Sequence, residues 1–123
     1  MQELFELKNW AVVGATEDTS KFGYKVYKKL KNHGFNVYPV NPKFDEIEGQ
    51  KCYHSLTDIP DPIDVISLIV NPKIGLEVID KAKEKGVKHV WCQPGAESQE
   101  LIEKAKSYGI NIIYNECVLV ELR

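Results

Sequence analysis

The sequence lacks the patterns that mark membrane, secreted and disulfide-stapled proteins. No apolar run approaches the ~18 residues that a membrane helix needs, and the first residues lack the basic segment and apolar stretch of a signal peptide. Cys52, Cys92 and Cys117 form no CxxC pair, which argues against a disulfide framework or a zinc site. A formal net charge of −2 gives no general attraction to nucleic acid. We therefore expect a cytoplasmic protein with reduced thiols and no metal, membrane or nucleic-acid partner.

Catalytic motifs are missing as well. The three histidines belong to no Ser–His–Asp arrangement and no HExxH motif, so we expect each to be structural or on the surface. No pair of carboxylates suited to acid–base chemistry is evident. A length of 123 residues is the size of one domain, and dehydrogenases built on nucleotide-binding folds usually need a second domain for substrate. We expect residues 1–123 to form a single domain without catalysis of its own.

What the sequence does contain is an alternation of short apolar runs with segments of helical period, which is typical of a parallel α/β sheet. We predict strands at 9–14, 36–40, 64–70, 88–92 and 110–114. The predicted helices cover 22–33, a segment that begins at Asn71 and Pro72, and 97–108. The fold class that follows is α/β: a three-layer Rossmann-like fold whose five parallel strands lie in the order 3-2-1-4-5, with helices on both faces.

Two further local patterns refine this prediction. A glycine follows each predicted helix, at Gly34, Gly86 and Gly109, where a left-handed residue commonly ends a helix. The stretch 45–64 is less regular, and we expect a short helical turn there, with Ser55 and Asp58 as a capping box.

Ligands of such sheets bind outside the carboxyl ends of the strands, where the strand order reverses. The loop that follows the first strand is not a GxGxxG fingerprint, because Thr16 replaces the middle glycine and the next glycine after Gly14 is Gly23. The loop still brings a helix N-terminus beneath the ligand, where backbone N–H groups and hydroxyls can hold a pyrophosphate. The alternative is that these hydroxyls only cap the helix.

The loop after the second strand ends in a cation. Proteins that bind NAD usually carry Asp or Glu about 20 residues beyond the last glycine of the first loop, to bind the ribose 2′-hydroxyl. Here that count arrives at Lys43, which follows Asn41 and Pro42. A lysine suits a phosphorylated ribose, as in coenzyme A and NADP; the alternative is a solvated surface lysine. Lys21 is a second candidate cation.

The remaining candidates lie after the later strands. The turn Gln93-Pro94-Gly95 either reverses the chain or borders the tail of the ligand. We expect Cys92 to be a small buried side chain. Cys117 lies beyond the last strand, and we predict that it reaches a thiol on the ligand.

Four segments together resemble the CoA-binding domain family, the small stand-alone relatives of the N-terminal domain of succinyl-CoA synthetase α-subunits: Val12–Thr16, Pro39–Lys43, Asp64–Val70 and Val90–Ala96. The resemblance covers nearly the whole chain and implies a Rossmann-like fold that binds the nucleotide end of coenzyme A. By that analogy the first loop and Lys43 meet the phosphates, Val70 to Pro72 flank the adenine or ribose, and Gln93 to Gly95 flank the pantetheine. The phosphohistidine loop and second domain of the synthetases are absent, so ligase activity is not implied.

The leading interpretation is a non-catalytic protein that binds coenzyme A as a carrier, sensor or thiol-protecting partner. Three alternatives stay open: an NADP-dependent reductase, a subunit that completes a CoA ligase with a partner chain, and a structural subunit with a vestigial pocket. A homodimer or association with an acyl-CoA enzyme is compatible with this interpretation. The predicted ligand residues are Gly14, Ala15, Thr16, Ser20, Lys21, Asn41, Pro42, Lys43, Val70, Asn71, Pro72, Gln93, Pro94, Gly95 and Cys117.

Overall fold

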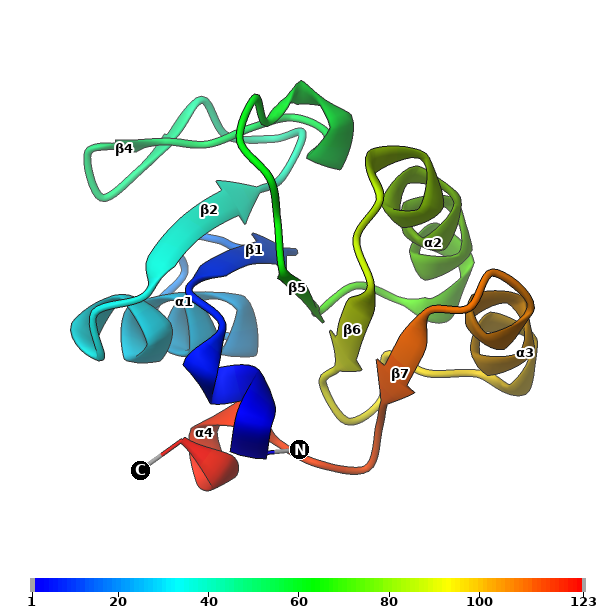
Figure 1. The fold of residues 1–123 in the computed structure, drawn as a ribbon. Coiled ribbons are helices and arrows are strands. Elements are labelled where there is room, and N and C mark those ends of the chain that lie inside the picture. Colours follow the sequence, from blue (N-terminus) through cyan, green and yellow to red (C-terminus); the bar gives the residue numbers. More distant parts are fainter. Residues whose placement is uncertain (1, 123) are drawn as a thin grey trace.

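The computed structural model describes residues 2–122 and has a five-stranded parallel sheet at its centre (Figure 1). The strands lie in the order β2-β1-β5-β6-β7. Helices cover both faces, which confirms the Rossmann-like α/β class. The strands are β1 (Asn9–Val13), β2 (Asn36–Val40), β5 (Val65–Leu68), β6 (His89–Cys92) and β7 (Asn111–Ile113).

The strand order departs from the expected assignment at one strand. The run 64–70 was expected outside β2, but β5 pairs with β1, from Trp10 opposite Val65 to Val13 opposite Leu68. All four residues of β5 are buried, and a strand that is apolar on both faces belongs in the middle of a parallel sheet. Tyr53 occupies the place outside β2 through a parallel bridge to Val40. If the Tyr53 bridge is counted as the third position and β5 as the fourth, the 3-2-1-4-5 pattern holds across the sheet, with β7 added as a sixth position beyond β6.

The helices divide between the two faces of the sheet. On one face α2 (Pro72–Lys85), α3 (Gln99–Ser107) and the 3-10 turn η2 (Leu56–Asp58) pack over one hydrophobic cluster. On the other, α1 (Phe22–Asn32), α4 (Val118–Glu121) and the 3-10 turn η1 (Gln2–Glu6) pack over a second cluster. A small hairpin of β3 (Glu46–Ile47) and β4 (Gln50–Lys51), which the sequence pattern did not predict, lies beside the sheet.

The predicted helix boundaries are largely confirmed. Asn71 caps α2, since its side chain accepts a hydrogen bond from the Ile74 amide. The glycines after the three long helices have φ values of +87°, +81° and +74°. α3 begins later than expected because Ser98 is its cap. The turn at η2 exists, but the capping box is wrong: no side chain caps it, and the Ser55 hydroxyl lies 3.2 Å from that of Thr57.

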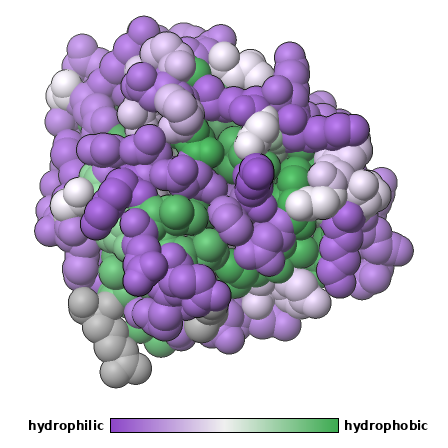
Figure 2. All heavy atoms as spheres, in the orientation of Figure 1, coloured by the Kyte–Doolittle hydropathy of each residue, from purple (hydrophilic) through white to green (hydrophobic). Residues whose placement is uncertain are grey.

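The surface and interior are those of an α/β protein with large aromatic residues in its core. Trp10 and Trp91 are fully buried, with ring centroids 6.3 Å apart. On the face shown in Figure 2, polar side chains cover most of the surface and apolar atoms are visible between them. Among residues 2–122, no helix has the length and apolarity needed to cross a membrane.

Candidate functional site

Three adjoining pockets form a groove along the carboxyl ends of the strands, and Val70 lines all three. The apolar pocket, about 410 Å³, lies between the ends of β1 and β2, η2 and α2. The loop pocket, about 700 Å³, lies between the first loop, the start of α1 and the end of β2. The Gln93 pocket, about 240 Å³, lies beside the turn after β6. We call the three together the carboxyl-edge groove.

The first loop is held close to the sheet by its two glycines. A Cβ on Gly23 would lie 2.1 Å from the carbonyl oxygen of Gly14, so only glycine lets α1 start this close to β1. Gly14 has a φ of +103°, and a Cβ there would lie 2.4 Å from the Ile69 carbonyl oxygen. Although their spacing is not that of GxGxxG, these glycines serve the same purpose of close helix–strand packing.

The N-terminus of α1 opens into the loop pocket without a capping side chain. Lys21 is the N-cap residue and makes no side-chain capping bond, which argues against the alternative that the loop hydroxyls cap this helix. The first amides of a helix have no partner within the helix and carry a partial positive charge. Lys21, Phe22 and Gly23 all line the loop pocket. This end of α1 can therefore accept an anion.

A tight turn in the first loop decides which of its hydroxyls are available. The Ser20 hydroxyl donates to Asp18 Oδ1 at 2.6 Å and the Ser20 amide donates to the same atom at 3.0 Å. These bonds hold the pKa of Asp18 below its usual value. Thr16 Oγ1 accepts from the Asp18 amide at 3.2 Å, which leaves its own proton free to donate. Thr16 is thus better placed than Ser20 to bind an anion.

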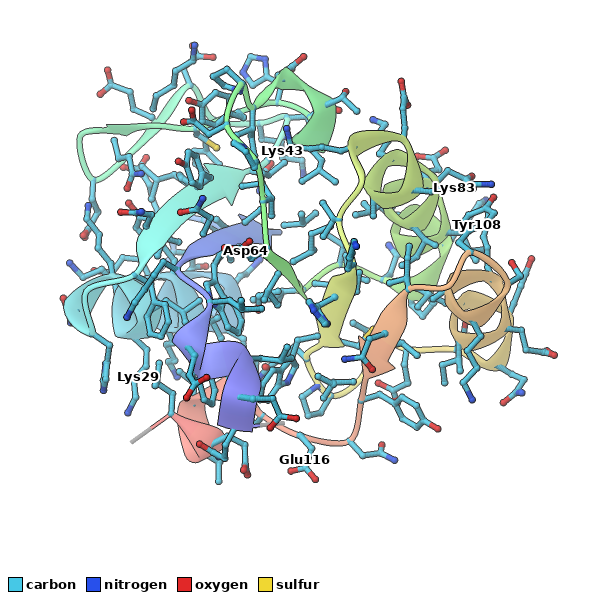
Figure 3. All side chains as sticks on the ribbon, in the orientation of Figure 1. Lys29, Lys43, Asp64, Lys83, Tyr108 and Glu116 are labelled. Carbon is cyan, nitrogen blue, oxygen red and sulfur yellow. The ribbon has the colours of Figure 1, made fainter. Side chains whose placement is uncertain are left out.

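Asn41 connects the two loops that flank the groove. Its Nδ2 donates to the Ala15 carbonyl at 2.8 Å, and its Oδ1 accepts from the Lys43 amide at 2.9 Å. Both polar ends of this side chain are therefore committed within the protein. The turn places Lys43 just beyond the end of β2 (Figure 3), where it lines both the apolar pocket and the loop pocket.

The apolar pocket contains residues that sequence reasoning missed. Ile74, Val78 and Lys81 all line it from α2, and their helical spacing is a signal that could have identified this second stripe. Lys81 Nζ donates to Ser55 Oγ at 3.0 Å, which joins α2 to η2 across the pocket. His54 also lines this pocket, and its Nε2 lies 2.8 Å from Asp45 Oδ1.

The groove is more positive than the rest of the protein. Leaving His54 aside, the charged residues that line it are three lysines, Lys21, Lys43 and Lys81, and two carboxylates, Asp18 and Glu77. The whole chain carries a formal net charge of −2, so the positive excess is local. Such an excess favours an anionic ligand at this edge of the sheet.

The structure brings twelve of the fifteen predicted ligand residues together in the groove. Ala15 does not line it: the residue is buried, and its carbonyl supports Asn41. Pro72 lies in the first turn of α2 and lines none of the three pockets of the groove. Cys117 lines none of the three pockets of the groove, but its sulfur lies 3.0 Å from Gln93 Nε2.

Comparison with known proteins gives a consistent result. Residues 8–123 match the model of the CoA binding domain family. The chain is 38% identical, over 93% of its length, to the acetate–CoA ligase [ADP-forming] II subunit alpha of Pyrococcus furiosus, and covers 27% of that protein. The chain spans 17–28% of the lengths of the curated ADP-forming acetate–CoA ligases it matches.

Solved structures of similar proteins share the fold. A conserved hypothetical protein from Pyrococcus furiosus is 44% identical, with a TM-score of 0.89, and the match covers 93% of this chain and 98% of that one. The apo form of a dinucleotide-forming acetyl-coenzyme A synthetase 1 from Ca. Korarchaeum cryptofilum is 36% identical, with a TM-score of 0.78, over 90% of this chain and 26% of that one. From the family match and these relatives, we conclude that the chain belongs to the CoA binding domain family.

Proposed function

We propose that this protein binds coenzyme A along the carboxyl-edge groove. Membership of the CoA binding domain family supports this ligand class. The three pockets follow one another in an order that suits the three chemical parts of coenzyme A: the adenosine, the phosphates and the pantetheine arm. In this proposal each part occupies one pocket or the junction between two.

The apolar pocket suits the adenine ring. Its walls include Val13, Val40, Leu56 and Val78, which are buried residues of the sheet, η2 and α2. Ile74 stands at this pocket with 47% of its surface exposed. A flat ring inserted here would cover Ile74 and gain roughly 25 cal/mol for each Å² of apolar surface removed from water.

The phosphates of coenzyme A suit the loop pocket and its junction with the apolar pocket. The uncapped start of α1 and the Thr16 hydroxyl offer donors for the pyrophosphate. Lys43 stands where the two pockets meet, and none of the ion pairs among residues 2–122 includes it. Its ammonium group is therefore available to the 3′-phosphate of the ribose. This position of Lys43 is the observation that carries the proposal.

Isothermal titration calorimetry tests this assignment by a thermodynamic cycle. Coenzyme A and 3′-dephospho-coenzyme A are each titrated into the wild type and Lys43→Ala. Because Lys43 is exposed, we expect the 3′-phosphate to contribute about 1–2 kcal/mol through it, or roughly 5- to 30-fold in affinity. Lys88→Ala is the matched control, since Lys88 is also exposed but precedes β6 at the opposite edge of the sheet. Equal affinities for both ligands in the wild type would refute the role of Lys43.

The same assay distinguishes coenzyme A from NADP, the phosphorylated alternative. Adenosine 3′,5′-bisphosphate carries the nucleotide end of coenzyme A without the pantetheine arm. We expect it to bind more weakly than coenzyme A, because the arm lies along the Gln93 pocket. An affinity for NADP above that for coenzyme A would favour a reductase instead.

A second candidate function is that of a CoA-binding subunit that needs a partner chain for catalysis. The observation that favours it is the match to a protein named as the alpha subunit of an ADP-forming acetate–CoA ligase. In this proposal the chain supplies the coenzyme site and the partner supplies the reacting groups. We expect the isolated chain to form no acyl-CoA from acetate, coenzyme A and ATP, and turnover by the pure chain would overturn that expectation.

A further inference from the structure

Gln93 is a buried polar residue with half of its amide unused. Its side chain follows β6, lines the Gln93 pocket and is only 3% exposed. Nε2 donates to the sulfur of Cys117 at 3.0 Å, whereas Oε1 has no hydrogen-bond partner in the described chain. If the amide is turned the other way, one polar atom still meets the sulfur and the other remains unpaired. Buried amides are rarely left in this state. The free atom therefore indicates that a polar group of a ligand in the pocket pairs with Gln93.

Cys117 is the accessible cysteine of the three. Cys52 and Cys92 are buried, while Cys117 is partly exposed. Burial raises the pKa of Cys52 and raises that of Cys92 to about 12, which keeps both as inert thiols at neutral pH. The segment that carries Cys117 is fixed against the sheet, because Trp91 Nε1 donates to the Glu116 carbonyl at 2.8 Å and Val118 is fully buried.

The groove leads toward Cys117. Lys43 at the end of β2 and Glu116 beyond β7 lie on opposite sides of the view in Figure 3. The loop pocket begins at β1, and the strands beyond it are β5, β6 and β7, so three strand spacings of about 4.8 Å put the end of β7 about 14 Å away. A pantetheine arm is comparable to about four extended residues and spans a similar distance of about 14 Å. A pyrophosphate held at α1 would therefore let the thiol reach the Gln93–Cys117 pair.

We propose that Cys117, positioned by Gln93, exchanges disulfides with the thiol end of coenzyme A. This inference rests on the proposed function, because the groove must first hold the nucleotide. In the reaction, the Cys117 thiolate attacks one sulfur of coenzyme A disulfide. The sulfur–sulfur bond of that disulfide breaks, and a new one joins Cys117 to coenzyme A. The second coenzyme A leaves as a thiolate and takes up the proton that Cys117 released, so the number of disulfides is unchanged. The product is the protein carrying one covalently attached coenzyme A.

Mass spectrometry of the intact protein under non-reducing conditions tests the exchange. The protein is incubated with coenzyme A disulfide or, at equal concentration, with glutathione disulfide. We expect a single adduct that maps to Cys117, forms at least about tenfold faster with coenzyme A disulfide, and saturates as its concentration rises. Adenosine 3′,5′-bisphosphate should slow the reaction. Absence of the adduct, its appearance on Cys52 or Cys92, or equal rates with both disulfides would overturn the proposal.

Variants separate binding from exchange. Cys117→Ser should abolish the adduct, and Lys43→Ala should slow its formation from coenzyme A disulfide more than its formation from glutathione disulfide. Gln93→Leu removes both polar atoms at similar volume and should slow the reaction of coenzyme A disulfide more than that of glutathione disulfide; equal slowing would refute the positioning role. Calorimetry with reduced coenzyme A distinguishes a failure of the exchange reaction from a failure of coenzyme A binding. If coenzyme A binds but no adduct forms, only the proposed exchange is refuted. If coenzyme A does not bind, the proposed function is refuted as well.

Discussion

Gly23→Ala tests the close contact between α1 and the end of β1. In this account the contact positions the start of α1 so that the first loop can bind an anion. A methyl group at this position would lie 2.1 Å from the Gly14 carbonyl oxygen, whereas ordinary contacts begin at 3.4 Å. The obstacle is backbone, so α1 must move away from the sheet. Helix propensity favours alanine by about 1 kcal/mol, but overpacking of this kind costs about 1–3 kcal/mol or more. We expect a net loss of stability and a displaced helix N-terminus.

Gly75→Ala is the matched control for this substitution. Its methyl group would meet Leu101 Cδ1 at 2.7 Å, which is the end of a flexible side chain that can rotate away. The propensity gain is the same, so the two variants differ mainly in what the added carbon meets. Urea denaturation should show Gly23→Ala to be less stable than Gly75→Ala by about 1–3 kcal/mol.

Calorimetry on the folded variants completes the test. Gly23→Ala should weaken the binding of coenzyme A, because the amides at the start of α1 no longer face the loop pocket. Gly75→Ala should bind like the wild type. If Gly23→Ala is as stable as Gly75→Ala and binds coenzyme A with unchanged affinity, the reasoning about this contact is refuted.

Three further predictions concern other parts of the protein. Asn41→Ala removes the bond to Ala15 that joins the two loops and the bond to the Lys43 amide within the second loop, so we expect a loss of about 1–2 kcal/mol in unfolding free energy and weaker coenzyme A binding; unchanged thermal and calorimetric data would contradict this. Asp80 accepts from Lys104 at 2.7 Å, and chiefly this bond lowers the pKa of Asp80. The stability it contributes is present above the unfolded pKa and is lost as pH falls through the folded value. Asp80→Asn should therefore make the unfolding midpoint less dependent on pH below about pH 4, and a midpoint that falls with pH as steeply as in the wild type would refute this. Iodoacetamide at neutral pH should alkylate Cys117 and spare Cys92, and peptide mapping that finds Cys92 modified first would show that the burial is misjudged.

Local sequence patterns predicted most of the fold because each rests on interactions between near neighbours. The Asn71 cap, the helix-ending glycines and the apolar strand runs all depend on residues a few positions apart. The strand order depends instead on which strand loses most from exposure to water, and the fully buried β5 takes the central place for that reason. Pattern alone also allowed this run a place outside β2, which is where we predicted it.

The candidate site was predictable where it follows from topology. Residues directly after parallel strands meet at one edge, so Gly14, Lys43 and Gln93 were identifiable from strand ends. The α2 residues Ile74 and Lys81 were missed because they lie on a helix beside the groove and do not directly follow a strand. The commitment of Ser20 to Asp18 could not be read from sequence either, since it depends on the conformation of the loop.

The most direct test of the central claim is a crystal structure of the protein with coenzyme A. We predict the adenine in the apolar pocket, the pyrophosphate at the start of α1, and Lys43 Nζ about 2.8 Å from an oxygen of the 3′-phosphate. A structure in which the adenosine lies outside the carboxyl-edge groove, with Lys43 directed into solvent, would contradict the account.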